Sequence, residues 1–252
     1  MPSWPLLTDT RRAIDTLESG VQELAAAFDP PILTGKPGFE WWQYEHPSGE
    51  LIVLLKAVRV VSGLNALLVL LEAGYTQEVG VLLRTVDDFV DEITFLLEAY
   101  DRDENTASQV KFVQDFFAEE IPLSAGLRQE KTRTDRVKRR QIQAGQARYL
   151  QPDNPDRVRK IVNAIDGVYS GYIHGGYPHI MEMYHGGDRP FEMRGMRKTV
   201  RISEYQKQIA AYVHRALAVL AVFAAIRGME SLHGRLKSAA KRFLDSPEYR
   251  KE

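Results

Sequence analysis

The 252-residue chain contains no cysteine. Disulfides, thiolate metal sites and a cysteine nucleophile are therefore excluded, and a reducing cytoplasm is permitted. The chain also lacks an excess of charge of either sign, since 33 Lys and Arg residues stand against 34 Asp and Glu residues, a net charge of -1. Any attraction to nucleic acid or to an anionic membrane must therefore come from a local patch.

Long uncharged apolar stretches are also missing. The longest, residues 60–71, has 12 residues, whereas a membrane span needs roughly 18 to 20. The first residues do not combine a basic segment with an apolar stretch, so we expect no signal peptide. We therefore predict a cytoplasmic protein without a membrane partner.

Apolar residues recur at steps of three and four along most of the chain, and no segment shows strand-like alternation joined by hairpin turns. This pattern predicts an all-α fold, a bundle of about six to seven helices in a single domain over residues 8–245. Residues 49–73 are apolar nearly all round and are followed, after Gly74, by a helical pattern over 77–99. The two segments predict a central apolar antiparallel hairpin.

The remaining helices are predicted over residues 14–28, 110–117, 155–174, 202–223 and 229–244. Asn154-Pro155 forms a helix start signal and Gly228 a helix break. Three segments are predicted to be irregular: an aromatic and proline-rich loop over 29–48, a basic connector over 123–153, and a Gly, His and Arg loop over 175–199. The first of these is long for a plain connector and indicates a lid or a partner surface. The alternative is that its aromatic side chains cap the open end of the bundle, as such residues more often do.

Charge is divided along the chain. From Glu72 to Glu104 there are ten acidic residues and two arginines, whereas Arg128 to Arg148 holds eight basic and two acidic residues. We expect the two blocks to attract each other. If the basic segment is helical, Arg133, Arg136 and Arg140 share a face that suits phosphate groups, because guanidinium forks match phosphate oxygens. The alternative is a solvated connector.

The acidic helix carries Asp87-Asp88-x-x-Asp91. Asp87 and Asp91 lie one turn apart on one face, where two carboxylates can hold a hard cation such as magnesium. Arg84 is placed to pair with Asp88 at i+4. The alternative interpretation is a wet acidic face docked on basic residues elsewhere.

Residues 169–185 are the richest segment in functional groups: Tyr169, Ser170, Tyr172, His174, Tyr177, His179, Glu182, Tyr184 and His185. Ser170 and His174 lie one turn apart, but Asp166 cannot orient the imidazole without bridging over the serine, so a hydrolase triad is not expected. The histidine spacings match no compact zinc or manganese motif. An aromatic-lined pocket wall or a packed loop is favoured.

Two resemblances follow from these motifs. The Asp87-Asp88-x-x-Asp91 run resembles the aspartate-rich motif of class I isoprenoid synthases, which are all-helical and bind diphosphate through magnesium. Asp166, Ser170 and His174 resemble the spacing of that family's second motif, with histidine where the family has glutamate and Gly167 where it usually has aspartate. This resemblance covers two short segments and implies magnesium as a cofactor.

The second resemblance rests on Leu82-Leu83-Arg84-Thr85 and on Tyr169-Ser170-x3-His174-Gly175. These runs look like a loosely defined group of bacterial helical proteins. Over roughly residues 50–180 the chain is also similar in outline to HEPN-type and abortive-infection helical domains of bacterial defence and stress systems, several of which cleave RNA. HEPN ribonucleases use arginine, four to six residues, then histidine. Arg227-x5-His233 fits, but chance is expected to give such a spacing in a chain with 22 arginines and six histidines.

Our leading hypothesis is an intracellular protein of the defence or stress type that binds RNA or a phosphate-bearing ligand, without a resident cofactor or metal. Its candidate catalytic residues are Arg84, Ser170 and His174, and its candidate ligand contacts are Asp87, Asp88, Asp91, Arg133, Arg136, Arg140, Tyr177 and His179. One alternative is a magnesium-dependent enzyme on a diphosphate, using Asp87, Asp91, Asp166 and Ser170. The other is a non-enzymatic scaffold that forms a homodimer through its long C-terminal helices.

Overall fold

The computed structural model describes residues 7–36, 38–101, 104–118, 137–151, 153–188, 190–197 and 199–246. Within these ranges the chain forms nine helices: α1 (Thr8–Ala25), α2 (Gly49–Ala73), α3 (Thr76–Asp101), α4 (Ala107–Phe117), α5 (Arg139–Leu150), α6 (Pro155–Ile173), α7 (Tyr177–Met181), α8 (Arg201–Ile226) and α9 (Glu230–Asp245). Strands β1 (Ile32–Lys36) and β2 (Phe39–Gln43) form one antiparallel hairpin. Arg133 and Arg136 lie outside the described residues.

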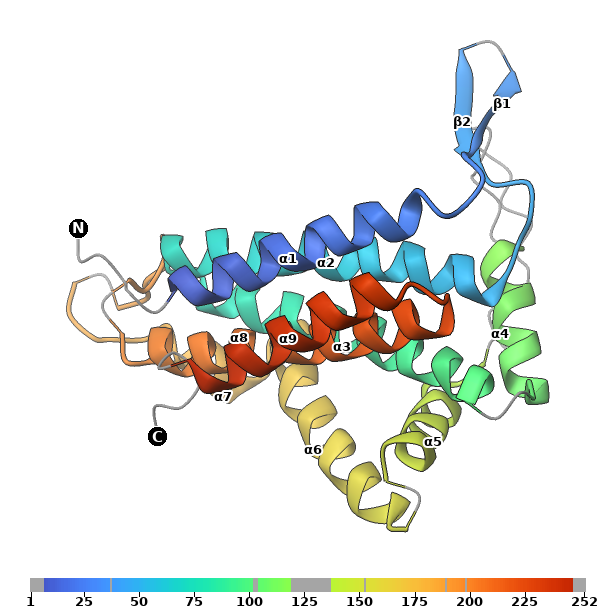
Figure 1. Cartoon of the computed structure of the whole chain (residues 1–252). Helices are drawn as coiled ribbons and strands as arrows, with labels where there is room; N and C mark the ends of the chain where they lie inside the picture. The colour runs from blue at the N-terminus through green and yellow to red at the C-terminus, as the bar shows by residue number, and fades with distance from the viewer. Residues whose placement is uncertain are drawn as a thin grey trace.

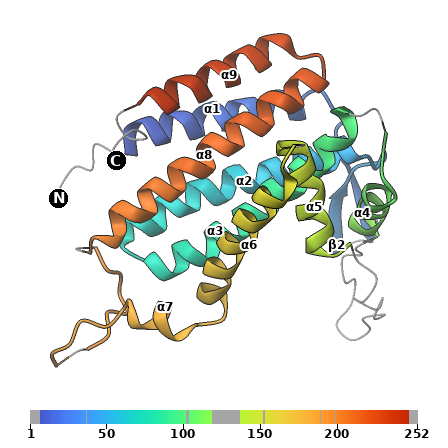
Figure 2. The same ribbon diagram turned by 90° about the horizontal axis from the view of Figure 1, so that it is seen from below.

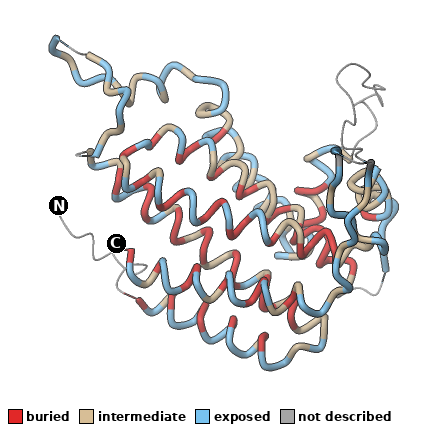
Figure 3. The backbone as a smooth tube through the Cα atoms, turned by 90° about the horizontal axis from the view of Figure 1, so that it is seen from above, coloured by how far each residue is buried: buried red, intermediate tan, exposed pale blue. Residues whose placement is uncertain are grey.

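Five long helices, α1, α2, α3, α8 and α9, build the bundle (Figure 1). Figure 2 shows α2, α3 and α8 running side by side, with α1 and α9 on one flank and α6 on the other. Buried residues line the inner sides of these helices in Figure 3. The predicted central hairpin is therefore confirmed, because α2 packs most extensively on α3.

Local sequence signals explain the bounds of the central hairpin. The side chain of Ser48 caps α2 by accepting a hydrogen bond from the Leu51 backbone N–H at 3.1 Å. Gly74 ends the helix with φ of +83°, a conformation that costs glycine little, and α3 begins two residues later. Asn154 likewise caps α6 before Pro155, as predicted.

The all-α prediction holds in outline, but nine described helices exceed the six to seven expected. The additional elements lie in segments predicted to be irregular. The β hairpin falls within residues 29–48, α5 within 123–153 and α7 within 175–199. The sequence of α5 contains few apolar residues, and it packs through buried glutamines and glycine, so apolar periodicity could not reveal it.

Helices α5 and α6 form a V-shaped pair, here called the arm, that projects from the bundle (Figure 1). Its contact with α3 is close: a Cβ on Gly80 would lie 2.5 Å from the Tyr172 ring, and one on Gly145 would lie 2.6 Å from the Phe95 ring. Glycine at these two positions therefore lets both arm helices approach α3.

The predicted apolar stripe of α6 packs against the bundle only in part, through Ile165 and Tyr172. Tyr169 is the buried residue of α6, whereas Ile161 and Val168 are exposed. The helical period was correct, but the stripe is only partly covered, because α6 also turns Asp166 and Tyr169 toward the bundle to meet charged and tyrosine side chains there.

Two of the described helices, α2 and α8, are long and apolar enough to cross a membrane by length and composition alone. Their mean hydropathies are 1.9 and 2.0, and 56% of each window is buried against other helices. Core helices pass the same test, so this observation is weak, and the cytoplasmic location stays a prediction.

We expect Gly80→Ala to loosen the arm. The added methyl group must displace the Tyr172 ring, and such overpacking costs typically about 1–3 kcal/mol, against a gain of about 1 kcal/mol in helix propensity. The matched control is Gly167→Ala, where a Cβ meets nothing within 4 Å. Urea unfolding should give a lower free energy of unfolding for the first variant and an unchanged or higher one for the second. Equal stability of the two variants would contradict this packing.

Candidate functional site

Two carboxylates and two guanidiniums form a closed set, here called the box, between α3, α5 and α8. Arg215 donates from Nη1 to Asp87 Oδ1 at 2.7 Å and from Nη2 to Asp91 Oδ1 at 3.0 Å. Arg139 donates from Nη2 to Asp87 Oδ2 at 3.4 Å and to Asp91 Oδ2 at 3.1 Å. Each arginine therefore bridges both aspartates.

A second group of charges lies at the outer edge of the box. Arg139 Nε contacts Asp166 Oδ1 at 3.1 Å, and Arg84 Nη2 contacts the same oxygen at 2.8 Å. Asp88 pairs with both Arg84 and Arg139. Three arginines and four aspartates from α3, α5, α6 and α8 thus form one charge network, and the predicted Arg84–Asp88 pair is confirmed.

Helical geometry positions the network. Asp87 and Asp91 lie one turn apart on α3, so both reach the side of α3 that α5 and α8 cover. Tyr212, one turn before Arg215 on α8, donates to Asp87 Oδ1 at 2.9 Å. Gln146 on α5 donates to Asp91 Oδ1 at 2.5 Å. Both carboxylates are buried, and hydrogen-bonded partners compensate the cost of burying them.

One carboxyl group of the box, Asp91, has a pKa close to neutral pH. Burial, reinforced by the nearby charge of Asp87, raises the pKa of Asp91 to about 7, although Arg215 and Gln146 act against this shift. Burial lowers the pKa of Arg139, and the charge of Arg84 adds to that effect. Burial opposes protonation of Arg215, but the charges of Asp87 and Asp91 raise its pKa overall.

A polar seam continues from the box along α6 and α8. Tyr169 donates to Gln208 Oε1 at 3.1 Å, and its ring packs 6.3 Å from that of Tyr212. Further along, Tyr172 donates to Glu182 at 3.2 Å, and Gln77 donates to the same carboxylate at 3.0 Å. The interface between α6 and the bundle is therefore largely polar.

The structure brings together Arg84, Asp87, Asp88 and Asp91, which the sequence predicted, but not the other candidates. Within the described ranges, no side-chain hydrogen bond or ion pair joins Ser170 or His174 to Arg84. His174 is exposed at the end of α6. Arg140 is exposed on α5, beside Arg139 rather than in the network.

The segment after α6, residues 174–201, displays aromatic side chains. Tyr177 is 78% exposed, and Tyr184 and Phe191 are also exposed, with ring centroids 5.3 Å apart. His179 instead packs edge-on against Tyr172 at 4.2 Å and lies over Gly171. Tyr177 is therefore open to a ligand, whereas His179 belongs to the packing of α7 on α6.

The HEPN-like spacing of Arg227 and His233 serves packing in this fold. Arg227 pairs with Glu50, donates to the Ala27 carbonyl and stacks on Phe28 at 4.7 Å. His233 Nδ1 lies 2.8 Å from the Ala221 carbonyl oxygen. The two side chains thus tie together the ends of α1, α2, α8 and α9.

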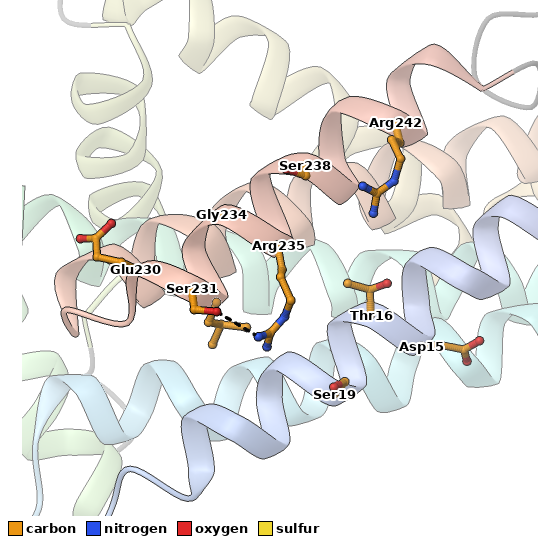
Figure 4. Close-up of a pocket in the computed structure, with 10 residues that line it drawn as sticks. Asp15, Thr16, Ser19, Glu230, Ser231, Gly234, Arg235, Ser238 and Arg242 are labelled. Atoms are coloured by element: carbon orange, nitrogen blue, oxygen red, sulfur yellow. Dashed lines mark hydrogen bonds between the residues drawn. The ribbon is translucent and has the colours of Figure 1, made fainter.

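A depression of about 790 Å³ lies between α1 and α9 (Figure 4). Its lining mixes Asp15 and Glu230 with Arg235 and Arg242. Arg235 also pairs with Glu23, outside the lining. Charges of both signs on an open surface give no preference for one class of ligand.

Sequence analysis missed Arg139 as a partner of specific aspartates, and it missed Arg215, Tyr212 and Gln146 altogether. A signal for Arg215 exists, because it is the single arginine between residues 202 and 226, in a mostly apolar helix. A lone charge on such a helix indicates a buried partner. Gln146 carried no comparable signal.

The raised pKa of Asp91 predicts a pH dependence. Folded chains keep a proton on Asp91 between about pH 4 and 7 that unfolded chains release, so this contribution to stability is complete below about pH 4 and is lost as the pH rises through about 7. Relative to Asp91→Asn, the wild type should lose up to about 1.4 kcal/mol per pH unit in this window. Urea unfolding of both proteins at several pH values measures the difference in their free energies of unfolding. The histidines contribute equally in both proteins, so their contribution cancels in this difference.

The matched control is Asp156→Asn, which changes an exposed aspartate paired with Arg159 on α6. Its curve should run parallel to that of the wild type. If the Asp91→Asn curve is parallel as well, Asp91 does not titrate near neutral pH.

The geometry separates two polar regions with different chemistry. The network pairs four carboxylates with three guanidiniums around the buried Asp87 and Asp91, so it joins helices. Among the described residues no group of three or more His, Asp or Glu side chains is arranged to hold a metal ion. Residues 174–201 instead present aromatic, imidazole and guanidinium groups to solvent, where a ligand can reach them. None of the family models, curated proteins or solved structures compared with the chain matches it.

Proposed function

We propose that the protein binds single-stranded RNA through residues 174–201, as a helical protein of the bacterial defence or stress type. The observation that carries the proposal is the exposed aromatic surface beside basic side chains. Exposed aromatic rings of this kind indicate a binding surface, and base stacking on such rings contributes about 1–3 kcal/mol per base.

The C-terminal part of this segment is held in place. Met196 N–H donates to the Gly74 carbonyl at 2.6 Å, and the Arg197 guanidinium donates to the Ala73 carbonyl at 3.1 Å. Gly195 lies so close that a Cβ there would be 2.1 Å from the Ala73 oxygen. These contacts anchor the returning chain on the turn between α2 and α3.

Charge supports the same ligand class. Residues 174–201 contain five basic and three acidic residues together with three histidines, a net charge of +2 with neutral histidine. The Arg201–Glu182 ion pair removes one base and one acid from this count, so the net charge of the remaining groups is still +2. Arg194 is exposed and is placed to contact a phosphate group.

The network around Arg84 is a less suitable site for RNA or phosphate. The Arg84 side chain is only 11% exposed and is paired with Asp88 and Asp166. The network as a whole contains four aspartates and three arginines. A phosphate there would have to displace carboxylates that already hold the guanidiniums.

Magnesium binding at the box would also require an existing partner to be displaced, in this case an arginine. Asp87, Asp91 and Asp166 do converge from two helices, but they converge on the Arg139 guanidinium. A magnesium ion would have to expel Arg139 from the box. RNA binding at residues 174–201 requires no such displacement and is therefore favoured.

Tyr177→Ala and Arg194→Ala are expected to weaken RNA binding in different ways. Loss of one stacking ring should lower the affinity about 5- to 150-fold, while loss of one phosphate contact should reduce the salt slope of binding by about 1. Fluorescence anisotropy with a labelled single-stranded RNA at several salt concentrations measures both. Val58→Ala, which changes an exposed side chain on α2, is the control and should leave binding unchanged. Absence of wild-type binding even at low salt would refute the proposal.

His174 is the candidate catalytic group of a ribonuclease-like activity, because it is exposed three residues before Tyr177 and an imidazole can act as a general acid or base. His174→Ala should keep RNA affinity but reduce cleavage at least about 100-fold. Gel analysis of end-labelled RNA measures cleavage, and growth of bacteria that express each variant measures toxicity. Unchanged cleavage in the variant, or no cleavage by the wild type, removes the catalytic part and leaves the binding proposal standing.

A further inference from the structure

The β hairpin exposes one apolar face. The register pairs Leu33 with Trp42, so these two side chains share a face. Leu33 is 51% and Trp42 is 68% exposed. A two-stranded hairpin is marginally stable on its own, and this one projects away from the helices (Figure 1). The Leu33–Trp42 face is therefore suited to contact with another surface.

The arm carries a second apolar surface without a partner among the described residues. Arg157, Ile161, Ala164 and Val168 follow one another at helical spacing along α6, and all four are exposed. Ile161 is 51% and Val168 is 56% exposed. This outer stripe has the length and composition of a helix face that normally lies in an interface.

The two surfaces have opposite charge. Around the hairpin face, residues 29–46 contain the exposed acids Asp29, Glu40 and Glu45 against one lysine, a net charge of -2. The described arm, residues 137–151 and 153–173, contains seven basic and three acidic residues, a net charge of +4. Asp166 is paired within the network, and Lys160 lies beside the outer stripe, which begins with Arg157. Apolar centres with complementary charged rims favour contact between the two surfaces.

Hairpin and arm cannot meet within one molecule, because they project from opposite sides of the five-helix bundle (Figure 1). A second copy of the chain presents both surfaces. When two copies are related by a two-fold axis, the hairpin of each can contact the arm of the other, which doubles the contact.

We propose that this protein self-associates through these two surfaces, with the Leu33–Trp42 face of one copy seated on the outer stripe of α6 in another. Trp42 is the central apolar anchor. Glu40, two residues from Trp42 on the same face, lies near the basic rim formed by Arg157 and Lys160. The contact uses neither residues 174–201 nor the C-terminal helices α8 and α9, so it is independent of RNA binding.

Sedimentation velocity over a range of protein concentrations tests the proposal. The wild type should sediment as a dimer or larger assembly at high concentration. Trp42→Ala and Val168→Glu should each weaken association about 30-fold or more, the loss expected for an interface anchor. The control Val69→Glu changes an equally exposed valine on α2 and should associate like the wild type. Circular dichroism should show unchanged helix content, since all three side chains are exposed.

A charge exchange tests which surfaces meet. Glu40→Lys and Lys160→Glu should each weaken self-association, whereas an equimolar mixture of the two variants should associate more strongly than either alone, because the new lysine faces the new glutamate. A monomeric wild type at all concentrations overturns the proposal. Association that Trp42→Ala and Val168→Glu leave unchanged overturns it as well, as does failure of the mixture to restore association.

Discussion

The acidic side of α3 is the constraint on which the rest of the structure depends. Leu83, Val86 and Val90 hold α3 in the core, so Asp87 and Asp91, on adjacent positions of the same turns, cannot reach bulk water. Buried carboxylates need cationic or hydrogen-bonding partners. The chain supplies them from sequence-distant helices, Arg215 on α8 and Arg139 on α5. The arm therefore docks on α3 by placing a cationic side chain, Arg139, against these buried carboxylates.

Apolar periodicity predicted the elements that pack through apolar faces, and it failed where packing is polar. The bounds of α2 were predicted because its interior is apolar and Gly74 marks its end, while the cap at Ser48 emerged only from the structure. Helix α5 lacks that signal, since Gln143, Gly145 and Gln146 are among its buried residues. In α6 the apolar stripe was visible, but Asp166 and Tyr169 determine which side faces the bundle. Apolar periodicity does not show whether an ion pair or an apolar contact determines the buried side of a helix, because the partner helix is not known from the sequence.

The acidic residues of the candidate site could be predicted from the sequence, whereas their arginine partners could not. Spacing placed Asp87 and Asp91 on one face, with a magnesium ion or docking on basic residues as the two interpretations, and the opposite charges of the two blocks indicated attraction. The box corresponds to the second interpretation, because guanidiniums from α5 and α8 pair with both carboxylates. Which arginine binds depends on how α5 turns after a long connection, and no spacing rule covers that distance. Ser170 and His174 were adjacent by sequence, but their distance from Arg84 depends on the tilt of α6.

Internal charge pairing also determines what remains on the surface. Arg139 and Arg148 of the arm are engaged with α3 carboxylates. Cations on the outside of the arm include Arg140, Arg157 and Lys160, and the exposed Asp156 pairs there with Arg159. The acids that balance the total charge lie elsewhere, including the hairpin segment. A chain with a net charge of -1 thereby acquires separate basic and acidic surfaces. Separation of this kind, with apolar side chains at the centre of each surface, orients one copy against another in a way that a uniformly neutral surface cannot.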